Sequence, residues 1–174
     1  MAFLTPEHLI DHLFIRDGGV VADIGSGSGA YLISLAKKVG EEGKVYAVDI
    51  HKEVLDTAKK TLDTLGYVNV DIIWADIEEG LYLDSYALDA VVISNTLFMI
   101  EDKVKALKEI KRVLIPEGLA LVVDWSKSHA GIGPHKDHVF TESQAEDLFT
   151  TSGFRIMARL PAGDYHYAFI AKSL

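Results

Sequence analysis

The sequence predicts a doubly wound α/β fold, with a mostly parallel seven-stranded sheet, one antiparallel C-terminal strand and helices on both faces. Three observations lead to this prediction. Apolar, β-branched runs alternate with amphipathic segments of helical period along most of the chain. A glycine-rich loop follows the first of those runs. Two strand-like stretches end the chain, and their connection is too short to hold a helix.

The N-terminal part of the chain is expected to form a short helix followed by a buried strand. Thr5-Pro6 is typical of a helix start. Gly18-Gly19 ends the helix, and the β-branched run at 20–24 predicts a strand that is buried on both faces. The apolar residues of the expected helix share one face: Leu9, Ile10, Leu13 and Phe14.

Helices and strands then alternate strictly, which predicts right-handed crossovers and a parallel sheet. The inward faces are expected to include Leu65 in the helix at 52–65 and Val104 in the helix at 102–114. Pro116-Glu117-Gly118 is expected to make a tight turn before the last strand of this series. The expected elements are helices at 28–39, 52–65 and 102–114 and strands at 44–49, 69–74, 88–94 and 119–125.

The C-terminal segment differs from the rest of the chain. Thr141 and Gln144 predict a capping box for one more helix, which ends at Gly153. Two extended stretches follow at 154–160 and 166–172, and only five residues join them. Strands with so short a connection pair antiparallel, so the sheet is expected to be mixed.

Composition bounds the class of protein. The 174 residues suit a single domain spanning 1–174. Seventeen basic and twenty-six acidic residues give a net charge of -9, which disfavours nucleic acid as a partner. No cysteine is present, so disulfides and thiolate chemistry are excluded. No segment has the length and hydropathy of a membrane span, and no signal peptide is recognised, so we expect a cytoplasmic location.

The sharpest local signal is DIGSGSGAY at 23–31, at the junction of the first strand and the following helix. Gly25, Gly27 and Gly29 allow a sharp turn and let a ligand approach the backbone at a helix N-terminus. Asp49 ends the next strand, where a carboxylate can bind both hydroxyls of a ribose. Together these residues predict an adenosine-containing ligand.

The loop alone does not decide which adenosine ligand binds. Gly25, Gly27 and Ala30 also satisfy the dinucleotide pattern, so an NAD(P)-dependent oxidoreductase is an alternative. Asp23, however, lies two residues before the first glycine, where a pyrophosphate would meet a second anion. S-adenosylmethionine presents a cationic ammonium and a sulfonium instead. The electrostatics therefore favour the methyl donor.

Over about residues 15–125 the sequence resembles the class I S-adenosylmethionine-dependent methyltransferases, within them the ubiquinone/menaquinone-biosynthesis-like type. The resemblance implies a Rossmann-like fold and methyl transfer to a small-molecule acceptor. It implies that DIGSGSG holds the methionine part of the donor, that the acid at Asp49 binds the ribose and that Asp76 in ADIEE contacts the adenine amino group. SNTLF places Ser94 and Asn95 beside the donor.

EIKRVLIPEGLALVVDW also resembles the LKPGG turn and fifth strand of that family, with Ile115-Pro116-Glu117-Gly118 departing from the usual turn sequence. Segments like the N-terminal one at 1–16 often form a lid in the family, and the alternative is that its apolar face simply covers the sheet. The acceptor and the oligomeric state are not identified, and a homo-oligomer is an alternative to a monomer. The expected donor-binding residues are Asp23, Gly25, Ser26, Gly27, Gly29, Asp49, Ile50, Ala75, Asp76, Ile77, Ser94 and Asn95.

Methyl transfer from a sulfonium is an in-line displacement, so positioning does most of the work and a base is optional. Candidate bases are His129, His135 and His138 in the polar loop at 126–138, with Asp124 before it. The histidines could alternatively hold a metal ion or be solvated, and a donor-binding protein without catalysis is a further alternative. Aromatic residues that could wall an acceptor pocket, or pack in the core instead, are Tyr31, Phe98, Trp125, Tyr165 and Tyr167.

Overall fold

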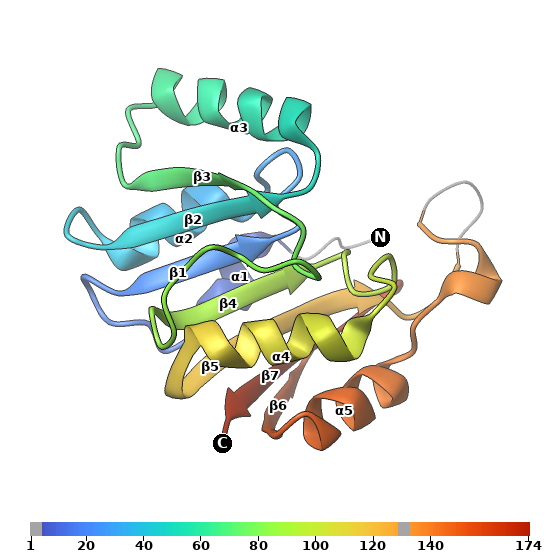
Figure 1. The fold of residues 1–174 in the computed structure, drawn as a ribbon. Coiled ribbons are helices and arrows are strands. Elements are labelled where there is room, and N and C mark those ends of the chain that lie inside the picture. The colour runs from blue at the N-terminus through green and yellow to red at the C-terminus, as the bar shows by residue number, and fades with distance from the viewer. Residues whose placement is uncertain (1–4, 129–132) are drawn as a thin grey trace.

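The centre of the computed structural model, which describes residues 5–128 and 133–174, is a seven-stranded sheet (Figure 1). Its strands are β1 (Val20–Ile24), β2 (Lys44–Asp49), β3 (Val70–Trp74), β4 (Leu88–Ser94), β5 (Leu114–Trp125), β6 (Phe154–Leu160) and β7 (His166–Ser173). The strand order is β3-β2-β1-β4-β5-β7-β6. The pairs among β1 to β5 are parallel, whereas β7 runs antiparallel to both of its neighbours. The predicted mixed sheet with one reversed C-terminal strand is therefore confirmed.

Helices cover both faces of this sheet, as predicted. They are α1 (Pro6–Ile10), α2 (Leu32–Val39), α3 (Lys52–Thr64), α4 (Lys103–Val113) and α5 (Glu142–Thr151), with a short 3-10 helix, η1 (Lys136–His138). Buried side chains of α2 and α3 and the apolar residues of α1 pack in one core layer, and those of α4 and α5 pack in another. Figure 1 shows α4 and α5 in front of the sheet and α2 behind it. Within 5–128 and 133–174 no helix is long and apolar enough to cross a bilayer.

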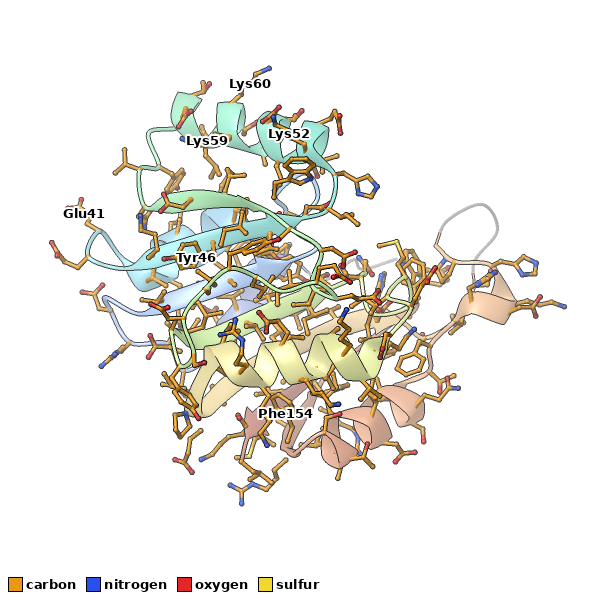
Figure 2. The ribbon with its side chains drawn as sticks, viewed as in Figure 1. Glu41, Tyr46, Lys52, Lys59, Lys60 and Phe154 are labelled. Atoms are coloured by element: carbon orange, nitrogen blue, oxygen red, sulfur yellow. The ribbon has the colours of Figure 1, made fainter. Side chains whose placement is uncertain are left out.

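The side chains predicted to face inward are buried or partly buried, with three exceptions. Figure 2 shows Lys60 pointing outward from α3, as expected for an amphipathic helix on a sheet. Phe14, Leu65 and Val104 were expected to face inward but are at least half exposed. Because α1 ends at Ile10, Phe14 falls outside its helical repeat. Leu65 lies beyond the last residue of α3, and Val104 lies off the buried stripe of α4.

The start of β5 also differs from the prediction. Leu114, expected to end a helix, instead pairs with Leu88 of β4. The residues at 116–118, expected to form a tight turn, lie within the strand as an irregularity, and regular pairing resumes at Leu119. Glu117 adopts the left-handed region there, with φ 65°. The chain thus absorbs the departure from the usual glycine-rich turn by bulging a strand.

The carboxyl edge of the parallel strands positions the site. In the sheet, β2 and β3 lie on one side of β1, and β4 lies next to β1 on the other side. The strand order therefore reverses between β1 and β4, which is where open α/β sheets form a ligand crevice. The ends of these strands lie to the right in Figure 1, and the arrowhead of β7 lies at the opposite edge.

Candidate functional site

Two cavities open at the carboxyl edge of the sheet and meet over the glycine-rich loop. Cavity A has a volume of about 340 Å³ and lies between α1, the loop after β1 and the start of β7. Cavity B has a volume of about 450 Å³ and lies along the ends of β2 and β3 and the loop after β4. The residues that line both cavities are Gly25, Gly27, Ser94 and Asn95.

The structure brings the predicted donor-binding residues together at these cavities, except for Gly29. Gly29 has φ +90°, and a side chain there would crowd Leu32, so this glycine serves the turn into α2. It lies in the lining of neither cavity. In addition to the shared residues, cavity A is lined by Asp23 and Ser26, and cavity B by Asp49, Ile50, Ala75, Asp76 and Ile77.

Backbone geometry explains the first two glycines of the loop in different ways. Gly25 has φ +72°, and an added Cβ would overlap the side chain of Thr96. Gly27 has φ +50°, but an added Cβ would meet no atom of the described residues within 4 Å. Gly25 is therefore needed for the close approach of two loops. Gly27 leaves open space where the two cavities join.

Asp23 is a buried carboxyl group inside cavity A. Its Oδ2 has no hydrogen-bond partner among the described residues, and neither has the hydroxyl of Ser26 in the same cavity. Burial raises the pKa of Asp23 to about 7, and the negative charge of Asp49 makes a smaller contribution in the same direction. Burial also raises the pKa of Tyr31, although a hydrogen bond with Ser94 opposes that shift. The cavity therefore holds polar groups that a ligand could satisfy.

Asp49 ties the end of β2 to the glycine-rich loop. Its Oδ2 accepts a hydrogen bond from the Gly27 amide at 2.9 Å, and its Oδ1 accepts one from the His51 amide at 2.9 Å. The Nδ1 atom of His51 lies 3.1 Å from the same Oδ1. A carboxylate oxygen accepts more than one hydrogen bond, so Asp49 keeps capacity for hydroxyl groups of a ligand in cavity B.

The far wall of cavity B combines a turn with exposed apolar side chains. The Asp76 carboxylate caps its own turn, because Oδ1 accepts a hydrogen bond from the Glu78 amide at 2.8 Å, and Asp76 also lines the cavity. Ile50 and Met99 line it too, and both are more than half exposed. Exposed apolar side chains that flank a concave site suit a flat ligand such as a nucleobase.

The predicted catalytic histidines gain no support from this geometry. His129 lies outside the described residues. His135 and His138 flank or end η1, with ring centroids 6.5 Å apart, and neither belongs to the lining of cavity A or B. In the described part of the chain no group of three metal-ligating side chains is found. The catalytic role of these three histidines stays a prediction.

Asp124, the other candidate base, lies on the opposite face of β5 from Val123, which lines cavity A. It is fully buried, and it accepts hydrogen bonds from the amides of Phe98 at 3.1 Å and Trp125 at 2.7 Å. Burial, opposed by backbone hydrogen bonds, raises the pKa of Asp124 to about 6. Asp124 therefore anchors the loop after β4 onto β5.

The aromatic residues divide between the cavity and the core. Tyr31 and Tyr165 line cavity A, and so does His166, which the sequence analysis did not select. Trp125 supports this wall through a tilted ring contact with His166, with ring centroids 4.2 Å apart. His166 was missed because its only sequence signal is its place at the start of the last strand. Phe98 and Tyr167 line neither cavity.

Comparison with known proteins relates this arrangement to one family. Residues 15–157 match the family model described as methyltransferase domain. The chain is 38% identical over 119 residues to the ubiquinone/menaquinone biosynthesis C-methyltransferase UbiE of Haemophilus ducreyi, covering 68% of this chain and 46% of that protein. It is 32% identical over 173 residues to UbiE of Hahella chejuensis, covering 98% of this chain and 66% of that protein. The chain thus spans about half to two thirds of the length of these relatives.

Solved structures agree with this relationship. The chain is similar to a SAM-dependent methyltransferase from Aquifex aeolicus, with a TM-score of 0.90, 30% identity and coverage of 97% of this chain and 89% of that one. The [4+2]-cyclase SpnF has a TM-score of 0.84 but 15% identity, with coverage of 97% and 80%, and shows the fold alone. This chain therefore belongs to the methyltransferase domain family and has the fold of the S-adenosylmethionine-dependent methyltransferases.

Proposed function

We propose that this chain transfers a methyl group from S-adenosylmethionine to a small-molecule acceptor. The observation that carries the proposal is the Asp23 carboxyl group, buried in cavity A with an oxygen that lacks a partner among the described residues. A cationic ligand group stabilises the ionised form of such a carboxyl, whereas a diphosphate would be repelled. S-adenosylmethionine carries two cationic groups and an adenosine.

The residues present fit this donor across both cavities. We assign Asp23 and the glycine-rich loop to its methionine part, Asp49 to its ribose hydroxyls and Asp76 to its adenine amino group. When bound, the donor supplies an electrophilic methyl carbon on a positively charged sulfur. The chain itself would hold an acceptor in line with that carbon and exclude water, which is the main requirement of the displacement.

The alternatives make different predictions. Gly25, Gly27 and Ala30, which motivate the dinucleotide alternative, line cavity A, but that alternative places a phosphate against Asp23, whose carboxylate would repel it. A change in NADH fluorescence on addition of protein would support it. A donor-binding protein without catalysis differs only in turnover, so formation of S-adenosylhomocysteine with any acceptor would exclude that alternative.

The wider setting follows from the same proposal. The name of the curated relatives refers to carbon methylation in ubiquinone and menaquinone biosynthesis, so acceptors of that kind are the first to test. The net charge of -9 supports a small molecule rather than nucleic acid.

We further propose that residues 1–174 act as one methyltransferase domain with residues 1–16 as its lid. Pro6 and Leu9 of α1 line cavity A, which supports that role. Cytoplasmic location and a homo-oligomer stay predictions of the sequence.

Titration calorimetry with S-adenosylhomocysteine tests donor binding directly. The wild-type chain should bind it, and Asp49→Ala should bind at least tenfold more weakly, because a hydrogen bond to a charged group contributes about 1.5–3 kcal/mol. Asp71→Ala is the matched control, since Asp71 pairs with Lys44 on the exposed part of the neighbouring strand. A folded wild-type sample that shows no binding would overturn the proposed function.

A further inference from the structure

His166 occupies a special position at the carboxyl edge of the sheet. It is the first residue of β7 and pairs with Trp125, the last residue of β5. Side chains alternate along a strand, and Ala168 and Ile170 of β7 belong to the core layer of α2. His166 therefore faces the same side of the sheet as α2, and it lines cavity A together with Asp23.

The imidazole of His166 is held in place and has an unused nitrogen. Its ring packs on Trp125 at a centroid distance of 4.2 Å and an interplanar angle of 39°. Its Nε2 is buried, yet has no hydrogen-bond partner among the residues that the structure describes. Burial lowers the pKa of His166, which favours the neutral form of the ring. A neutral imidazole has one nitrogen with a free lone pair.

Cavity A reaches from the glycine-rich loop after β1 to the start of β7, three strands along the sheet. Its lining includes the glycine-rich loop at one side, and Tyr165 and His166 from the connection into β7 at the other. When a ligand occupies the glycine-rich loop, the rest of cavity A is bounded by the connection into β7. Groups on that wall are the ones that a second substrate would meet.

We infer that His166 is the base of the proposed methyl transfer, with Nε2 receiving a proton from an acidic O–H or N–H of the acceptor. This inference rests on the proposed function. As the proton moves to Nε2, the acceptor atom forms a bond to the methyl carbon, and the bond from that carbon to sulfur breaks with its electron pair left on sulfur. The products are the methylated acceptor, S-adenosylhomocysteine and an imidazolium, which later returns its proton to water.

Nitrogen NMR of histidine-labelled protein tests the inference without knowledge of the acceptor. With S-adenosylhomocysteine bound at pH 7.5, we expect the His166 signals of a neutral ring whose proton is on Nδ1. Phenol, a small compound with an acidic O–H, should shift the Nε2 signal. A proton found on Nε2, or an Nε2 signal that phenol leaves unchanged, would overturn the inference.

Two variants separate this inference from the proposed function. His166→Gln should bind S-adenosylhomocysteine with a dissociation constant within about twofold of wild type, because the residue is assigned to the acceptor. Lys60→Gln, at an exposed residue of α3 that points away from the sheet and lines neither cavity, is the control for both measurements (Figure 2). Loss of binding in His166→Gln alone would mean a structural or donor-binding role. If the wild-type chain does not bind S-adenosylhomocysteine, the proposed function itself is overturned.

Kinetics supply a second measurement once an acceptor is turned over. His166→Gln should lower kcat by about 10²–10⁴, the usual contribution of a general base, with KM for the donor unchanged. The rise of wild-type kcat with pH should disappear in the variant. Asp23, Tyr31, Asp164 and Tyr165 share cavity A, so the titration of His166 is compared with that in Asp23→Asn. Equal kcat in wild type and His166→Gln would overturn the inference.

Discussion

Asp23 is a carboxyl group whose ionisation opposes folding and favours ligand binding. Burial, with a smaller contribution from the charge of Asp49, raises its pKa from the ordinary 3.8 to about 7. A raised pKa in the folded state means that this group lowers stability as pH rises from about 4 to about 7. An ammonium group in cavity A would reverse the preference and stabilise the carboxylate. Ligand binding should therefore release a proton when the pH is below 7.

The expected result is that S-adenosylhomocysteine binds about tenfold more weakly at pH 6 than at pH 8, since one pKa unit corresponds to 1.36 kcal/mol. Calorimetry in two buffers of different ionisation enthalpy measures the proton release at each pH. Asp23→Asn should bind more weakly at pH 8 and lose the pH dependence. A pH dependence that survives in Asp23→Asn would show that another group titrates.

At the scale of elements, the loop after β4 depends on a carboxylate from β5. Asp124→Ala would remove the acceptor of the Phe98 and Trp125 amides. Leaving these two partly buried donors without partners should cost about 2–4 kcal/mol, which lowers Tm by roughly 5–15 °C for a domain of this size. Thermal unfolding measures the loss, and hydrogen exchange should accelerate at both amides but not in α3.

The same carboxylate gives a pH signature. Its pKa of about 6 in the folded chain lies above the ordinary 3.8, so its ionisation lowers wild-type stability as pH rises from about 4 to about 6. The destabilisation by Asp124→Ala should consequently be larger at pH 5 than at pH 7.5. Unchanged exchange at the Phe98 amide would argue against the anchoring role and restore Asp124 as a candidate base.

The elements that the sequence predicted well are those whose burial has a simple period. The run at 20–24 is a strand whose residues are all buried after the first, as expected for a strand covered on both faces. The prediction from this period is wrong where an element ends early, as at Phe14, or where a strand contains an irregularity, as at Glu117. Those outcomes depend on tertiary packing, which local spacing does not encode.

The site was predictable to the extent that it follows single strand ends. Asp23, Asp49 and Asp76 each lie within or just after a strand that the sequence identifies, and all three line a cavity. His166 was not predictable in this way. Its place opposite Trp125 depends on β7 entering the sheet between β5 and β6, and the short connection predicted a reversed strand without its neighbours.

At the scale of the whole molecule, the two cavities join segments that are far apart in the chain. Their linings come from the ends of β1, β2 and β3 and also from the loop after β4 and the start of β7. A ligand across both cavities therefore binds only when both halves of the sheet are assembled. Anything that binds the folded state alone stabilises it, by about 2.7 kcal/mol when its concentration is a hundredfold above Kd.

We therefore expect S-adenosylhomocysteine at that concentration to raise Tm by roughly 5–10 °C in a single unfolding transition, because one kcal/mol shifts a domain of this length by about 2–4 °C. Scanning calorimetry measures the shift. NADH at the same concentration should leave Tm unchanged, since its diphosphate would meet the Asp23 carboxyl. A shift of equal size with NADH would favour the dinucleotide alternative, and two separate transitions would mean that the ligand stabilises only half of the sheet.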